Sequence, residues 1–184
     1  MPTVRYTFDS MRSCVWVNGR SSLHPINTET RGIEGWFETA MLDDGSLNLS
    51  TPVTGELQVK VDKLSSGNQL YDRELKRRVD ARKYPTIFGQ MTRVTSAGAQ
   101  GRYLVTGDLS FHGKTHTFEH EMSIIREDED TVSLKGEYVF DIREFNMKPP
   151  SMLMLKVYPE VAVTVELYGL RDGRPTSEGR ERLQ

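Results

Sequence analysis

Apolar and polar side chains alternate on both sides of a short turn in residues 101–125. The turn is His112–Gly113–Lys114, where glycine accepts the backbone angles of a tight hairpin. Successive side chains of a strand point to opposite faces, so a period of two gives one apolar face and one wet face. The segment therefore predicts a β-hairpin that lines an apolar interior with Tyr103, Val105, Gly107, Leu109, Phe111, Phe118, His120, Met122 and Ile124.

The same alternation recurs along most of the chain. It predicts strands at residues 4–8, 13–20, 33–38, 56–62, 86–94, 131–142 and 161–167, and a hairpin turn at Asp43–Gly45 with Leu47 and Leu49 beyond it. Eight or more strands form either a sandwich or a barrel. Closure removes exposed edges, and a barrel of about eight strands just encloses one small ligand. We therefore expect an all-β fold in a single domain, residues 1–170.

Residues 68–82 break this pattern because they contain neither glycine nor proline and are rich in helix-forming residues. Tyr71, Leu75 and Val79 recur every four residues and form a narrow apolar stripe. Asn68 is a suitable N-cap for a helix here, and Pro85 is a suitable residue to end it. We expect one helix on a β-scaffold.

The chain has 184 residues with a net charge of −2, which predicts no general attraction to nucleic acid. The first residues show no secretory signal pattern, and no apolar run approaches the ~20 residues that span a bilayer, so we expect a cytoplasmic protein that does not span a membrane. Cys14 lies in an apolar run and is expected to be buried. The polar tail, residues 171–184, is expected to be disordered.

Five motifs in order give residues 4–169 a resemblance to the YceI-like family. They are Gly35–Trp36–Phe37; residues 57–68, LQVKVDKLSSGN; residues 80–87, DARKYPTI; residues 107–115, GDLSFHGKT; and residues 142–147, IREFNM. The resemblance implies a lipocalin-like, eight-stranded antiparallel barrel with a helix in one long connection. It also implies a lumen for an isoprenoid or another long-chain amphiphile. It carries over no catalytic residues.

Asn146 stands where this family usually has glycine. Asparagine is the best non-glycine residue for a positive φ angle, so the turn is expected to survive. Met147, Met152 and Met154 lie near Pro149–Pro150, either as adaptable surface for a variable guest or as ordinary packing. Asp141 and Arg143 flank Ile142 and project to one face, where we expect them to pair with residues of neighbouring strands in a structural rather than a catalytic role.

The histidines at 112, 116 and 120 would share one face of a helix, a spacing that suggests zinc. The β-branched residues between them favour a strand, where His116 and His120 lie about 13 Å apart. We therefore expect no metal site and no cofactor.

The leading hypothesis is a protein that binds a hydrophobic or amphiphilic long-chain molecule in the lumen. Its expected lining is Phe37, Leu57, Val59, Val61, Leu109, Phe111, Phe118, Met122, Tyr138, Phe140 and Val163. Cations of the helix are candidates for contact with a polar head group, unless they form only a solvated face: Arg73, Arg77 and Arg78.

Two alternatives remain open at this point. The barrel could be filled by its own large side chains, Trp16 and Trp36 among them, and serve as an interaction or stress-related module. It could instead be an enzyme for an apolar substrate, with His116, His120 or Tyr138 as acid–base groups. A homodimer is plausible on either reading.

Overall fold

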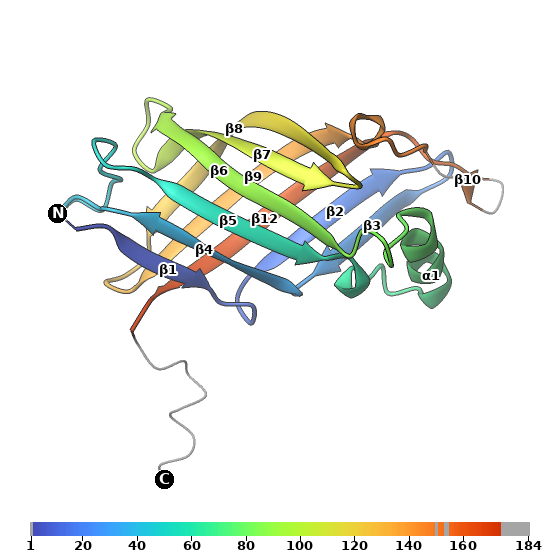
Figure 1. Cartoon of the computed structure of the whole chain (residues 1–184), viewed down its shortest axis with the longest axis horizontal. Coiled ribbons are helices and arrows are strands. Elements are labelled where there is room, and N and C mark those ends of the chain that lie inside the picture. Colours follow the sequence, from blue (N-terminus) through green and yellow to red (C-terminus); the bar gives the residue numbers. More distant parts are fainter. Residues whose placement is uncertain (1, 150, 153–154, 174–184) are drawn as a thin grey trace, which may run out of the picture.

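A ten-stranded antiparallel sheet that closes on itself makes up most of the protein (Figure 1). The computed structural model describes residues 2–149, 151–152 and 155–173. The strands of the sheet are β1 (Val4–Phe8), β2 (Cys14–Arg20), β3 (Pro25–Thr30), β4 (Ile33–Thr39), β5 (Thr54–Lys60), β6 (Thr86–Ser96), β7 (Arg102–Phe111), β8 (Lys114–Arg126), β9 (Thr131–Asp141) and β12 (Glu160–Arg171). Two short strands, β10 (Ser151–Met152) and β11 (Leu155–Lys156), pair with each other. The helical elements are α1 (Gln69–Arg78) and the 3₁₀ turns η1 (Val61–Lys63) and η2 (Ile142–Phe145).

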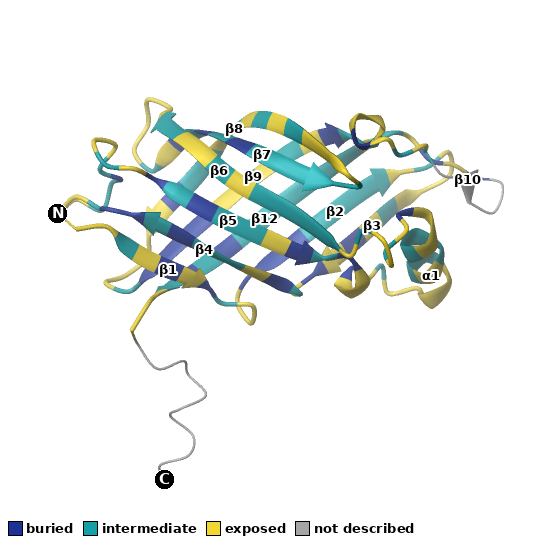
Figure 2. Cartoon of the chain, in the orientation of Figure 1, coloured by how far each residue is buried: buried dark blue, intermediate teal, exposed yellow. Residues whose placement is uncertain are grey.

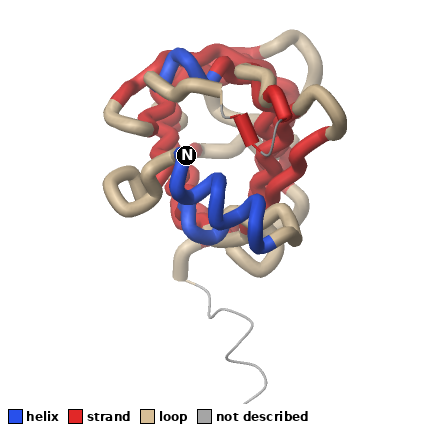
Figure 3. The backbone as a smooth tube through the Cα atoms, turned by 90° about the vertical axis from the view of Figure 1, so that its right-hand side faces the viewer, coloured by secondary structure: helices blue, strands red, loops and turns tan. Residues whose placement is uncertain are grey.

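Strand β12 closes the sheet because both of its edges are paired. One edge runs along β9 over residues 160–170. The other edge is divided between β2, which pairs with residues 162–166, and β1, which pairs with residues 169–171. Since β3 pairs with β2 and β4 with β1, the ten strands occupy eight positions around the axis. The expected eight-stranded antiparallel barrel is confirmed, and Figure 3 shows its ring end-on, with a helix lying across this end.

The period of two decides which side chains face the interior. Along β7, Tyr103, Val105 and Gly107 are buried and their neighbours Leu104 and Thr106 are not. Figure 2 shows the resulting bands of buried, half-buried and exposed residues along the strands. The hairpin predicted from residues 101–125 is confirmed as β7 and β8, paired from Arg102 opposite Ser123 to Phe111 opposite Lys114.

The barrel end farther from α1 is filled by the protein's own side chains. Tyr6, Tyr103, Ile124 and Val132 belong to one buried cluster there. Leu47, in the connection between β4 and β5, joins this cluster, and its backbone N–H donates to the Tyr103 hydroxyl at 2.9 Å. This buried hydrogen bond ties the connection to the barrel wall, so this end is packed shut.

The predicted helix exists but is shorter than residues 68–82. Asn68 caps it as expected, because its side-chain oxygen accepts from the backbone N–H groups of Leu70 and Tyr71. The helix stops at Arg78 because Asp80 adopts a positive φ of 49°. The N–H of Asp80 bonds to the Arg77 carbonyl and that of Ala81 to the Lys76 carbonyl, which is the pairing of a Schellman C-terminus.

Strand β3 is not among the strands predicted from the sequence. Its inward residues Thr28 and Thr30 are buried but polar, so the strand lacks the apolar alternation that reveals the others. The Thr28 hydroxyl donates to the Val17 carbonyl, which offsets its burial. The predicted hairpin at Asp43–Gly45 is a turn with only one isolated bridge, Met41 to Leu47, rather than a pair of strands.

The last part of the barrel extends slightly past its predicted limit. Arg171 pairs with Tyr6 as the final residue of β12, and Asp172 accepts from the Thr7 hydroxyl, so residues 171–172 belong to the barrel rather than to a tail. Gly173 is the last described residue, and the rest of the predicted tail, residues 174–184, lies outside the described residues. Cys14 is buried as expected, and burial raises the pKa of its thiol. Within the described part of the chain, no helix has the length and apolarity that crossing a bilayer requires.

Candidate functional site in the barrel lumen

A cavity of about 780 Å³ extends from the barrel end beside α1 into the interior of the barrel. Its wall extends from Leu134 and Leu167 inside the barrel to Leu75 of α1 and Phe145 of η2. Lys148 and Tyr158 also line it and are exposed, so the cavity reaches solvent beside α1. We call this opening the mouth. The volume lies within the ~300–1,000 Å³ that is typical of small-molecule sites.

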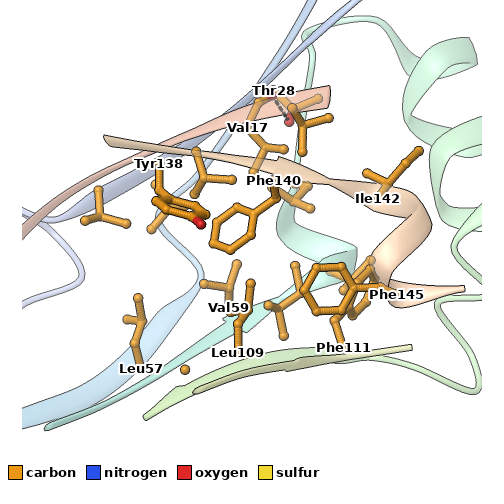
Figure 4. A pocket seen from close by; sticks show the side chains of 18 of the residues that line it. Val17, Thr28, Leu57, Val59, Leu109, Phe111, Tyr138, Phe140, Ile142 and Phe145 are labelled. Atoms are coloured by element: carbon orange, nitrogen blue, oxygen red, sulfur yellow. Dashed lines mark hydrogen bonds between the residues drawn. The ribbon is translucent and has the colours of Figure 1, made fainter. Parts of the chain in front are cut away.

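The structure places every predicted lining residue on the wall of this cavity. The eleven are Phe37, Leu57, Val59, Val61, Leu109, Phe111, Phe118, Met122, Tyr138, Phe140 and Val163. Figure 4 shows several of them pointing into the same space from opposite strands, among them Leu57, Leu109 and Phe140. Contact of these residues with a ligand stays a prediction.

Several inward side chains are only half-buried, which indicates hollow space rather than solid packing. Leu57, Phe118, Met122 and Val163 all lie on the inner face, yet each keeps partial solvent exposure. The two tryptophans do not plug the lumen. Trp16 is not among the lining residues, and its indole N–H donates to Glu29. Trp36 is among them, but its indole N–H donates to Glu56 and its ring packs against the exposed Arg5, whose guanidinium lies 4.0 Å from the ring centroid.

Aromatic rings from neighbouring strands form one wall of the cavity. The ring centroids of Tyr138 and Phe140 on β9 lie 4.5 Å apart, and that of Phe118 on β8 lies 6.0 Å from Tyr138. Phe145 of η2 continues the wall, 6.2 Å from Phe140. These separations fall in the range in which aromatic pairs attract beyond simple burial.

The helix contributes two of the three predicted head-group cations to the mouth. Arg77 and Arg78 line the cavity, whereas Arg73 is not among its lining residues. The Glu74 carboxylate accepts from Arg77 at 2.7 Å and from Arg78 at 2.6 Å. Hydrogen bonds from Arg77 and Arg78 lower the pKa of Glu74 to about 2. Their role toward a ligand stays a prediction.

The histidines do not converge. His112 adopts a positive φ of 52°, and its Nδ1 lies 3.1 Å from the Phe145 carbonyl oxygen. His116 lies outside the cavity wall and approaches Glu144 at 3.5 Å. His120 faces the cavity, and its pKa is lowered by burial. No group of His, Cys, Asp and Glu within the described residues is arranged to hold a metal ion.

Sequence reasoning missed part of the wall near the mouth. Ile26 and Thr28 come from the unpredicted strand β3, and Ile142 and Phe145 come from η2. Neither segment shows an apolar period of two. The positive φ expected of Asn146 is confirmed at 57°, and this residue ends η2. Met147 lines the cavity, whereas Met154 and the side chain of Met152 lie outside the described parts.

Two other predicted features near the mouth can be placed. Arg143 folds back onto Asp141, and their side chains form a bidentate pair with a shortest contact of 2.6 Å. The two residues therefore pair with each other, rather than with residues of neighbouring strands as the sequence predicts. His24 lies in the loop before β3, with its Nε2 3.4 Å from the Tyr71 hydroxyl of α1.

Comparisons with known proteins agree on the fold. A family model described as the YceI-like domain matches residues 6–168. BcnA of Burkholderia cenocepacia superposes with a TM-score of 0.73 at 18% identity, covering 88% of this chain and 98% of that protein. A polyisoprenoid-binding domain of Saccharophagus degradans, implicated in plant cell wall breakdown, superposes with a TM-score of 0.73 at 12% identity, covering 91% and 99%.

A third similar structure is the YceI protein of Campylobacter jejuni, with a TM-score of 0.64 at 11% identity, covering 81% of this chain and 86% of that one. No curated protein sequence matches the chain significantly. At these identities the structural likeness establishes the fold.

Proposed function

The chain belongs to the YceI-like family, and on this premise we propose that it binds one hydrophobic or amphiphilic long-chain molecule, isoprenoid or lipid-like, in its lumen. The observation that carries the proposal is the cavity of about 780 Å³ with its apolar wall. The similarity to a structure described as a polyisoprenoid-binding domain supports the same class of ligand.

The size of the cavity sets the size of the guest. If one non-hydrogen atom takes about the ~30 Å³ of a water molecule in the liquid, the lumen holds roughly 25 chain atoms. Burial of ten methylenes at about 0.8 kcal/mol each contributes roughly 8 kcal/mol, which corresponds to micromolar affinity before ordering costs. A longer chain would extend through the mouth.

The orientation follows from the two ends of the barrel. The far end is closed by the buried cluster around Tyr6 and Tyr103. The mouth carries Arg77, Arg78 and the exposed Lys148. We propose that the tail of an amphiphile points inward and that its head group stays near these cations, where an anionic group would compete with Glu74 for the guanidinium groups.

The other two interpretations have less support. A filled barrel would leave no room for a chain, and the lumen is hollow. An enzyme would place its acid–base groups beside the substrate, yet His116 does not line the cavity. His120 and Tyr138 do line it. Homodimerisation stays a prediction.

The test is a titration of the purified full chain with a fluorescent long-chain fatty acid, followed by displacement with isoprenoid alcohols of increasing length. We expect saturable one-to-one binding near micromolar Kd. Displacement should strengthen with length until roughly 25 chain atoms and then level off. Absence of saturable binding by the probe and by every alcohol would overturn the proposal. Recovery of chemically altered alcohol would favour the enzyme instead.

A further inference from the structure

Two polar side chains face the lumen beside each other on a mostly apolar wall. His120 lies on β8 and Tyr138 on β9, and their ring centroids are 5.4 Å apart in an edge-to-face arrangement. Both line the cavity. Figure 4 shows the Tyr138 hydroxyl directed into the open space rather than into the strand behind it.

Among the described residues, no hydrogen bond joins either polar group to another residue. Two other polar groups of the wall are partnered: Thr28 donates to the Val17 carbonyl, and His112 Nδ1 lies 3.1 Å from the Phe145 carbonyl oxygen. Polar groups in apolar surroundings are costly unless they are hydrogen-bonded. The pair is therefore available to whatever fills the lumen.

The pair lies well inside the barrel rather than at the mouth. His120 is four residues along β8 from His116, whose ring lies 6.1 Å from Phe145 of η2. At ~3.3 Å per residue, this is about 13 Å of strand. The cavity also continues past the pair, because Leu134, four residues along β9 from Tyr138, still lines it.

The surroundings suit a neutral group and oppose an ion. Phe118 and Phe140 flank Tyr138, with ring centroids at 6.0 Å and 4.5 Å. Burial lowers the pKa of His120, so its imidazole is uncharged at neutral pH. A neutral imidazole and a phenol each offer one donor and at least one acceptor, and neither compensates a charge.

We propose that His120 and Tyr138 form a subsite for an uncharged oxygen, a carbonyl or hydroxyl, placed part-way along the chain of the ligand. This inference rests on the proposed function and narrows the class of ligand. A plain hydrocarbon chain displaces water from both side chains and forms no hydrogen bond with either of them. A chain with an oxygen at this depth forms hydrogen bonds to His120 and Tyr138 in place of those to water. It therefore binds more tightly than the plain hydrocarbon chain.

The test uses octadecanoic acid and its keto derivatives with the carbonyl at carbon 4, 7, 10 or 13. Each is titrated against the full chain by displacement of the fluorescent fatty acid. We expect one interior position to bind about tenfold more tightly than octadecanoic acid, since two hydrogen bonds of ordinary strength are gained. The remaining positions should bind about as the parent acid does.

Two variants assign the preference to the pair. Tyr138→Phe removes only the hydroxyl, and His120→Phe keeps an aromatic ring on the wall. Each should bring the ratio of keto to parent affinity close to one while the parent acid still binds. Val139→Ala is the matched control, because Val139 neighbours Tyr138 on β9 but is 56% exposed and does not line the cavity. Its ratio should equal that of the unmodified chain.

The outcomes separate the two proposals. Binding of octadecanoic acid without preference for any keto position, or a preference that survives both aromatic variants, overturns the subsite and leaves the lumen as a hydrocarbon site. Failure of every acid and of the fluorescent probe to bind overturns the proposed function itself.

Discussion

Gly107 lies directly opposite Phe118 in the β7–β8 ladder, and the missing side chain of the glycine makes room for the phenylalanine ring. A Cβ atom at Gly107 would lie 2.6 Å from the Gln90 carbonyl oxygen and 2.8 Å from the Phe118 ring. Backbone on one side and an aromatic ring on the other leave little room to adjust. The pairing therefore fixes both the strand contact and the position of one wall of the lumen.

Gly107→Ala should destabilise the fold by about 1–3 kcal/mol, the usual cost of overpacking. Gly136→Ala is the matched control, because its Cβ would meet Cγ of Met122 at 3.0 Å and Cε at 3.4 Å, and that unbranched side chain can move. Urea unfolding of both variants checks the difference. Equal losses of unfolding free energy in the two variants would contradict the tight packing around Gly107.

Asn68→Ala should cost about 1 kcal/mol, because the side-chain oxygen caps two backbone N–H groups of α1. Asn68→Ser should recover most of this loss, since serine also caps. The free energy of unfolding in urea measures both. An unchanged stability of the alanine variant would mean that the cap is dispensable.

Acid stability should depend on Glu74. Its pKa is held at about 2, below its ordinary value of 4.5, so its ion pairs stabilise the fold above pH 4.5 and are lost as the pH falls toward 2. The free energy of unfolding should therefore fall less steeply between pH 4.5 and 2 in Glu74→Gln than in the unmodified chain. Glu129 is exposed in the connection between β8 and β9, and Glu129→Gln should leave this dependence of unfolding free energy on pH unchanged.

Gly89→Phe should block the lumen without straining the backbone. A Cβ atom there meets nothing closer than 3.9 Å, and the residue lines the cavity. We expect at least tenfold weaker binding of the fluorescent fatty acid, because the added ring takes the space of several chain atoms. Val139→Phe adds the same ring to the outer face and should not alter binding. Equal affinity of the two variants would place the site elsewhere.

The lining could be predicted from sequence because strand geometry leaves a side chain only two choices of face. Once Val105 and Leu109 are inward, parity fixes Gly107 and Phe111 as well. The same rule does not apply to β3, whose inward threonines carry no apolar signal, or to η2, whose side chains follow no period of two. The lining from these two elements became known only from the structure.

The cations of α1 show a second limit. Basic residues occur around most of the predicted helix, so the sequence alone could not tell which of them face the mouth. The rotation of α1 is set by packing of Leu75 and Val79 against Val61 and Leu64, a contact between segments that periodicity does not report. That packing turns Arg77 and Arg78, but not Arg73, toward the cavity.

The most direct measurement is a native mass spectrum of the full chain purified from cells without detergent and then incubated with an isoprenoid alcohol of about 25 chain atoms. We expect a single adduct of the alcohol's mass on the unmodified chain and on Val139→Phe, and its loss from Gly89→Phe. An unmodified chain that carries no adduct at any alcohol concentration, or a Gly89→Phe chain that carries it equally, would contradict a guest inside the lumen.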